Sequence, residues 1–281
     1  MTNDTLILGA VAYDPKVVTI WDGFTRYFEK HGLAFDYVLY SNYERQVEGH
    51  FAGQFHVAWN SPLAWIEAER VARTKGRKAQ AIAMRDTDCD LTSVIVVRQN
   101  SPIRKLEDLR GKSIGVGAWD SPQATMIPLE HLAAAGLIAE QDFQVRRHDR
   151  LVGKHGDHIG GERDAARALI LGEVDAACMI DGNHLLFAQD GTLPAGGTRI
   201  LSQTGRYDHC NFTVLEPAPA DLIRRFRELL LAMRYADPEV RPLLDLEGLK
   251  EWRPGRVSGY DLLNRAVDRL GTIDAWLRAV A

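Results

Sequence analysis

Three short polar stretches of this sequence carry the side chains that could do chemistry. They read MRDTDCD at residues 84–90, GKHGDH at 153–158 and YDHCNF at 207–212. Each lies at or just beyond the end of an apolar run that predicts a strand. Imidazole, carboxylate and thiolate groups bind transition metals, and a thiolate beside an imidazole is also a nucleophile. We therefore expect the three stretches to contribute to one shared site.

A metal would find its candidate ligands in two of these stretches. The set is His155, Asp157, His209 and Cys210, holding one divalent transition metal such as Zn, Mn or Co. Adjacent residues of an extended strand point to opposite faces, so His209 and Cys210 can share an ion only where the backbone turns. The His-x-Asp-His spacing is not an established metal motif. A site without any cofactor therefore remains the alternative.

A catalytic role would centre on Cys210 or on a metal-bound water as the nucleophile. The other candidates for this chemistry are His155, Asp157 and His209 as proton carriers, with Arg85 and Lys154 as cations that favour the thiolate. The alternative role for Cys210 is that of a small buried residue at the start of a strand.

The composition excludes several classes of protein. The chain has 281 residues, 46% of them apolar and 26% charged, with a net charge of -4. No basic face for nucleic acid is indicated, and no stretch approaches the roughly 20 apolar residues of a membrane span. The start, MTNDTLILGAVAY, has no basic segment before its apolar run, so we expect no signal peptide and a cytoplasmic protein. Three widely spaced cysteines favour free thiols, and a homo-oligomer remains open.

Apolar runs alternate with helical periodicity along most of the chain. Strands are expected over LILGAVAY, FDYVLYS and FHVAWNS, with helices between them that end at Gly32 and Gly53. This rhythm predicts an α/β fold in which helices flank mainly parallel sheets. The length suits two lobes, which we place at residues 1–90 plus 205–281 and at residues 91–204, with a ligand cleft between them.

Four further stretches give the pattern a family likeness. GQFHVAWNSPLAW, SPIRKLEDLRGKSIGVG, DSPQATMIPLEHLAAAGL and LILGEVDAACM follow one another in an order that resembles the phosphonate and phosphite type of solute-binding proteins of ABC transporters. The resemblance covers most of residues 5–235. It implies the two-lobed periplasmic-binding-protein fold.

The resemblance also implies which residues contact a ligand. The family holds its oxyanion at a Ser-Thr-Ser-Gly-like run at a helix N-terminus, and the matching positions here are Ser121, Pro122, Gln123, Ala124 and Thr125. Pro122 has no N–H, so a tetrahedral phosphonate would meet fewer donors. The residues that the resemblance places near the ligand elsewhere are Tyr13, Trp59, Asn60 and Ser61, and Lys154 joins them as a cation.

Two functions compete on these observations. The first is a cytosolic enzyme on the binding-protein fold that acts on a small anion, a cyclic or heterocyclic carboxylate, by hydrolytic or eliminative chemistry such as desulfhydration. The second is a non-catalytic substrate-binding component of a phosphonate or phosphite transporter. The excess of titratable side chains and the altered anion-binding run favour the enzyme.

Overall fold

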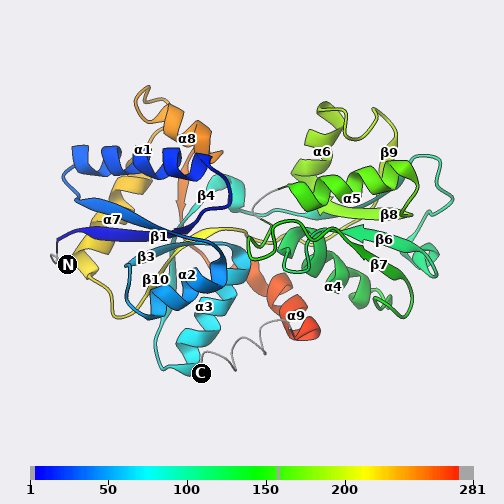
Figure 1. Ribbon diagram of the computed structural model, residues 1–281, viewed down its shortest axis with the longest axis horizontal. Helices are drawn as coiled ribbons and strands as arrows, with labels where there is room; N and C mark the ends of the chain where they lie inside the picture. The colour runs from blue at the N-terminus through cyan, green and yellow to red at the C-terminus, as the bar shows by residue number, and fades with distance from the viewer. Residues whose placement is uncertain (1–3, 157–158, 272–281) are drawn as a thin grey trace. The chain divides into compact units, whose positions relative to one another are not determined.

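The computed structural model describes residues 4–156 and 159–271, which form two α/β units (Figure 1). Unit 1 contains residues 4–89 and 208–260, and unit 2 contains the other described residues. The two-lobed α/β fold expected from the sequence is thus the one observed. One segment differs from the expected division, because helix α9 (Asp261–Leu270) packs against α4 of unit 2 although it follows residue 205.

Unit 1 is a six-stranded mixed sheet with the order β11-β4-β10-β3-β1-β2. Strands β1, β2 and β3 are parallel, and β10 runs antiparallel to both β3 and β4 because the chain returns from unit 2 into the middle of this sheet. The elements of unit 1 are β1 (Leu6–Val11), α1 (Lys16–Lys30), β2 (Phe35–Tyr40), α2 (Tyr43–Phe51), β3 (Val57–Asn60), α3 (Pro62–Thr74), β4 (Ala79–Arg85), η1 (Asp86–Asp88), β10 (Asn211–Leu215), α7 (Ala220–Ala232), α8 (Arg241–Glu247), β11 (Trp252–Pro254) and η4 (Ser258–Tyr260).

Helices cover both faces of this sheet, and alternate residues of β1 show why. Leu6, Leu8 and Ala10 are buried in one core with side chains of α1, α7 and α8. Val11 points to the other face and joins a second core with α2 and α3. Figure 1 shows α1 and α8 on one side of the strands and α2 and α3 on the other. The period of two along the strand therefore assigns each helix to a face.

Unit 2 is a five-stranded mixed sheet with the order β7-β6-β8-β5-β9. Strands β6, β7 and β8 are parallel, whereas β5 is antiparallel to β8 and β9. Helices α5 and α6 bury one face and α4 the other. The elements not yet given are β5 (Ser93–Arg98), η2 (Leu106–Leu109), β6 (Ser113–Val116), the π-helical turn η3 (Pro122–Met126), α4 (Ile127–Ala134), β7 (Gln144–Arg147), α5 (Gly160–Leu171), β8 (Ala176–Ile180), α6 (Asp181–Gln189) and β9 (Thr198–Gln203).

Among residues 4–156 and 159–271, no helix is both long enough and apolar enough to cross a bilayer.

Candidate functional site

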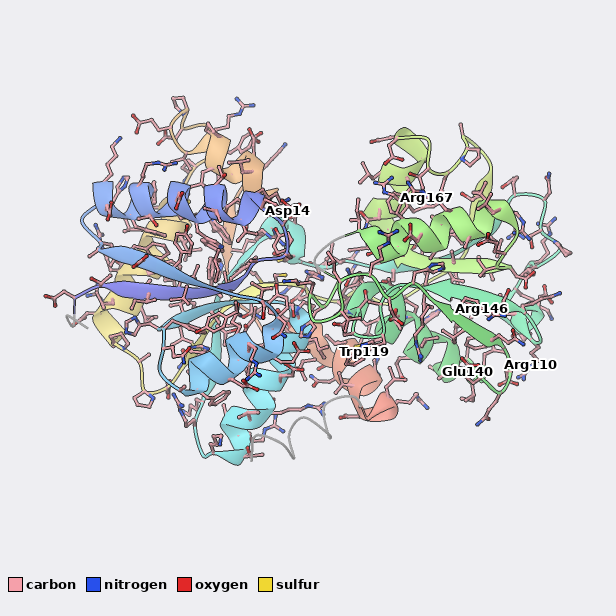
Figure 2. The ribbon with its side chains drawn as sticks, viewed as in Figure 1. Asp14, Arg110, Trp119, Glu140, Arg146 and Arg167 are labelled. Atoms are coloured by element: carbon pink, nitrogen blue, oxygen red, sulfur yellow. The ribbon has the colours of Figure 1, made fainter. Side chains whose placement is uncertain are left out.

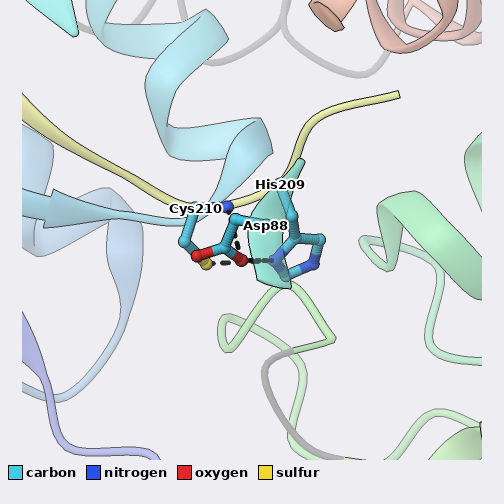
Figure 3. Close-up of side chains that lie close together, drawn as sticks. All are labelled: Asp88, His209 and Cys210. Carbon is cyan, nitrogen blue, oxygen red and sulfur yellow. Dashed lines mark hydrogen bonds and ion pairs between the residues drawn. The ribbon is translucent and has the colours of Figure 1, made fainter. Parts of the chain in front are cut away.

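Three side chains of unit 1 converge at the ends of two neighbouring strands (Figure 3). They are Asp88, which ends η1 after β4, and His209 and Cys210, which directly precede β10. His209 Nδ1 lies 3.1 Å from Cys210 Sγ and 3.4 Å from Asp88 Oδ1. All three residues are buried. They form a polar cluster inside the unit, which we call the Asp-His-Cys cluster.

His209 and Cys210 lie just before β10, which begins at Asn211, and so stand outside the regular strand. The His209 N–H donates to the Asp88 carbonyl at 2.8 Å, and the Tyr260 hydroxyl donates to the His209 carbonyl at 2.8 Å. The Cys210 N–H donates to Asp88 Oδ1 at 3.2 Å. These bonds hold the backbone of both residues, and the 3.1 Å between His209 Nδ1 and Cys210 Sγ shows that the two side chains lie on the same side, which is the condition for a shared ion.

Arg85 neutralises this cluster from the end of β4. Its Nε and Nη2 donate to the two carboxylate oxygens of Asp88 at 2.5 and 3.0 Å, and the guanidinium lies 3.9 Å from the Glu247 carboxylate. Burial would raise the pKa of Asp88, but the charge of Arg85 lowers it to about 2. Burial would lower the pKa of Arg85, and the charges of Asp88 and Glu247 raise it well above its ordinary value. Both side chains are therefore ionised at neutral pH.

The aromatic residues expected at the ligand differ in exposure. Trp59 is 4% exposed, and its ring packs 4.7 Å from the Phe212 ring and 5.1 Å from the Arg85 guanidinium carbon. Tyr13 is half-buried at the core edge, with Lys16 Nζ 5.8 Å from its ring centroid. Trp59 therefore contributes to the core of unit 1, and Tyr13 retains accessible surface.

Two polar residues that follow the Trp59 position stabilise the fold locally. Asn60 donates to the Thr213 hydroxyl at 2.9 Å and accepts from Gln46 Nε2 at 2.7 Å. Ser61 accepts from the Ala64 N–H at 3.1 Å and so caps the N-terminus of α3. Both are buried, and these contacts are the ones that sheet and helix require.

In unit 2 the expected anion-binding run starts a helix. Residues 122–134 form the π-helical turn η3 followed by α4, and Ser121 caps the turn by accepting from the Ala124 N–H at 3.3 Å. The Thr125 hydroxyl donates to the Ala118 carbonyl at 2.7 Å. The Ser121 hydroxyl thus accepts a hydrogen bond, whereas the Thr125 hydroxyl donates one.

Gln123 connects this helix start to the loop before α5. Its Nε2 donates to the Gly156 carbonyl at 2.7 Å and to Glu162 Oε1 at 3.2 Å, whereas its buried Oε1 has no hydrogen-bond partner among the described residues. A Cβ on Gly156 would lie 2.6 Å from both Gln123 Nε2 and Ser121 Oγ. The loop backbone therefore touches the residues that were expected to bind the ligand.

The loop itself contains the remaining histidine candidate. His155 is fully buried at a positive φ of 50°, and the Lys154 N–H donates to the Leu151 carbonyl at 3.1 Å. Asp157 lies outside the described residues. His155 belongs to unit 2, whereas His209 and Cys210 belong to unit 1. The four-residue metal set thus stays a prediction as a group, and the partner of His209 and Cys210 in the described structure is Asp88.

Gly156 offers a test of this loop contact. Both Gly156→Ala and Gly136→Ala place a Cβ at positive φ, 77° and 79°, but only Gly156 has neighbours within 4 Å. We expect Gly136→Ala to lower the free energy of unfolding by about 1 kcal/mol and Gly156→Ala by about 2–4 kcal/mol. Urea unfolding of the full chain measures both values. Equal losses would contradict tight packing of the loop on Gln123.

Two acidic side chains contribute to these sites beyond the roles expected from the sequence. Asp88 was expected to join the shared site as one of several polar residues but was not placed in the metal set, although its carboxylate completes the cluster. The buried Asp120 accepts from the Gly153 N–H at 2.6 Å and thus fastens the loop. The sequence could have indicated this role, because Asp is common in turns that precede helices and Asp120 stands directly before Ser121. The preceding residue, Trp119, is exposed (Figure 2).

The chain is similar to a known protein family and to several solved structures. A family model described as "ABC transporter, phosphonate, periplasmic substrate-binding protein" matches residues 10–260. The PhnD1 protein of Prochlorococcus marinus, solved with methylphosphonate, has a TM-score of 0.69 at 17% identity, covering 96% of this chain and 99% of its own. A binding protein of a Pseudomonas aeruginosa phosphonate transporter has a TM-score of 0.63 at 14% identity, covering 98% and 96%. A Xanthomonas citri protein bound to ATP reaches 0.71 at 16% identity, covering 96% and 98%.

The expectation of a cytosolic enzyme is wrong on these findings. The matched family consists of transporter substrate-binding proteins and not of hydrolases, lyases or desulfhydrases, and it is described as periplasmic. The expectation of a cytoplasmic protein rested only on the residues at which the sequence begins. Of the groups expected to be catalytic, Arg85 donates to the Asp88 carboxylate and Cys210 is 1% exposed.

Proposed function

Since the chain belongs to the family of periplasmic substrate-binding proteins of phosphonate ABC transporters, we propose that it binds a small phosphonate-class anion for delivery to a membrane transporter. The single observation that carries this proposal is the family match over residues 10–260, which includes every strand of both sheets except the first part of β1. Phosphonate-binding proteins typically need no cofactor, so anion binding in this proposal requires none.

In this proposal Ser121 is the principal anion contact of unit 2. Its hydroxyl stands at the N-terminus of the helix over residues 122–134, where the helix dipole favours negative charge. Thr125 stabilises the backbone next to the site, because its hydroxyl donates to the Ala118 carbonyl. Because Pro122 has no backbone N–H to donate, the anion would depend more on the Ser121 hydroxyl and the Gln123 side-chain amide for hydrogen bonds.

Gln123 would bind the ligand by donating a hydrogen bond to an oxygen of the anion in place of the Gly156 carbonyl. Its Nε2 now donates to the Gly156 carbonyl at 2.7 Å, and an oxygen of the anion would replace that carbonyl. A charged oxygen is the stronger acceptor, because hydrogen bonds to ionised groups are roughly twice as strong as neutral ones. Ligand binding would then free the loop at Gly156 from Gln123.

Isothermal titration calorimetry of the full chain tests the proposal. Methylphosphonate, phosphite and phosphate are the probes, and methanesulfonate and benzoate are the comparison anions. We expect at least one of the phosphorus oxyanions to bind more tightly than both comparison anions. Ser121→Ala should weaken that binding by about 10-fold to 100-fold, the usual effect of one hydrogen bond to a charged group.

The matched control is Asn42→Ala, since Asn42 also caps a helix by accepting from the Arg45 N–H at 2.8 Å. Both substitutions remove a cap, but only Ser121→Ala should change the affinity. Failure of all three phosphorus anions to bind the wild-type chain would overturn the proposed ligand class. An equal effect of the two substitutions would remove Ser121 from the site.

A further inference from the structure

We propose that Asp88, His209 and Cys210 of unit 1 bind one divalent ion of the Zn²⁺ class, with one donor atom from each side chain. This proposal does not depend on the proposed anion binding. Carboxylate oxygen, imidazole nitrogen and thiolate sulfur are the three donor types that Zn²⁺ takes in proteins. The donor atoms of the cluster all lie within 4.8 Å of one another.

The separations between the donor atoms fit tetrahedral coordination. Zinc-to-ligand distances of about 2.0–2.3 Å place two donors of a tetrahedral site roughly 3.3–3.6 Å apart. His209 Nδ1 lies 3.4 Å from Asp88 Oδ1 and 3.1 Å from Cys210 Sγ. These two separations are within a few tenths of an ångström of the tetrahedral values, and the Asp88 and Cys210 donor atoms lie within 4.8 Å of each other. Three protein ligands leave the fourth position for a water.

The hydrogen bonding of the cluster also favours an ion at this point. His209 Nδ1 is within contact distance of both the Asp88 carboxylate and the Cys210 sulfur, and one proton on that nitrogen can be donated to only one of them at a time. An ion in place of the proton would satisfy all three atoms together. Figure 3 shows dashed lines from the imidazole nitrogen to the carboxylate oxygen and to the sulfur.

Arg85 would act as the outer partner that holds a metal ligand. Its two hydrogen bonds orient the Asp88 carboxylate, which is the usual role of a residue one step removed from a metal. The charges also balance. A divalent ion and Arg85 would be matched by Asp88, by the Cys210 thiolate and by Glu247, whose carboxylate lies 3.9 Å from the guanidinium. The buried site would therefore carry no net charge.

The other cysteines provide matched controls because their surroundings differ. Cys89 is half-buried and its Sγ contacts the Arg85 carbonyl at 3.4 Å, so it lies near the cluster but outside the donor set. Cys178 is buried in β8 of unit 2, and burial raises the pKa of its thiol to about 12. Neither belongs to a three-residue metal-binding group among the described residues.

Cobalt binding tests the site directly, because Co²⁺ substitutes for Zn²⁺ and a thiolate ligand gives it a charge-transfer absorption band in the near ultraviolet. The full chain is freed of metal with a chelator and titrated with CoCl₂, then with ZnCl₂ in competition. We expect one equivalent of Co²⁺, the thiolate band, and displacement by Zn²⁺. Cys210→Ala should abolish the band, His209→Ala should weaken metal binding by about 100-fold or more, and Cys89→Ala should retain both.

Circular dichroism shows whether each variant is folded, and the test uses His209 and Cys210 variants because an Asp88 variant would leave Arg85 buried without its carboxylate. Absence of the band in the wild-type chain would overturn the proposal, as would its persistence in folded Cys210→Ala or its loss in folded Cys89→Ala. No phosphonate is present in this experiment. Its failure is therefore distinct from a failure of the proposed anion binding.

Discussion

Arg85→Met is expected to lower the free energy of unfolding of the full chain by about 3–5 kcal/mol at pH 7. The substitution leaves the Asp88 carboxylate, 2% exposed, in the interior without the guanidinium that now donates to both of its oxygens. It also removes the cation that lies 5.1 Å from the Trp59 ring. Urea unfolding followed by tryptophan fluorescence and circular dichroism measures the loss.

Two further variants separate charge from packing. Arg45→Met removes a pair with Glu48 at the surface, where the Arg45 side chain is 69% exposed, and should change stability by less than about 0.5 kcal/mol. The double variant Arg85→Met with Asp88→Leu removes the buried Arg85–Asp88 pair and leaves the buried Glu247 carboxylate without the guanidinium, so it should recover part of the loss. If the double variant were as unstable as Arg85→Met alone, the lost packing of Arg85, and not the unpaired carboxylate, would explain the effect.

The alternation of apolar runs with helical segments was sufficient to predict the fold class, because the period of two along β1 and the caps at Ser61 and Ser121 are local properties. Strand direction is not local. β10 enters the sheet between β3 and β4 only after the chain has built most of unit 2, and nothing in NFTVL indicates that it runs antiparallel. The mixed character of the sheets therefore appeared only in the structure.

The candidate site was predictable in its chemistry but not in its partners. His209 and Cys210 stood out by residue type, whereas Asp88 lies 122 positions before Cys210 and reaches it only through the pairing of β4 with β10. His155 was grouped with them because both stretches are polar and follow strands. That pattern carries no information on which of the two units a residue joins.

Trp59 illustrates the corresponding limit for ligand contacts. An aromatic residue after a buried strand suits a ligand site and a core equally well on sequence alone, and the neighbouring ring of Phe212 decides for the core. Gly156 shows the reverse case. Its contact with Ser121 and Gln123 gives the loop a place at the proposed anion site, although a glycine in a polar loop indicates only a turn.

The buried His50 of α2 should make unit 1 sensitive to mild acid. Burial lowers the pKa of His50 from 6.5 to about 3, with its ring stacked 4.6 Å from Phe55. Below pH 6.5 His50 binds a proton in the unfolded chain but not in the folded chain. The free energy of unfolding therefore falls by about 1.4 kcal/mol per pH unit until the pH approaches the pKa of His50 in the folded chain. The expected loss from this residue is about 2 kcal/mol between pH 7 and pH 5.

Urea unfolding at pH 7, 6 and 5 measures this dependence in the wild-type chain and in His50→Gln, which cannot titrate. The variant should lose markedly less stability than the wild type on acidification, because the folded and unfolded states then bind the same number of protons at this position. His184→Gln is the control, since half-burial also lowers the pKa of His184 but leaves it in contact with water. That variant should stay closer to the wild-type slope. Parallel slopes for the wild type and His50→Gln would show that folding does not lower the pKa of His50. The structure argues against that result, because His50 Nδ1 is buried and has no partner among the described residues to accept a hydrogen bond from a protonated ring.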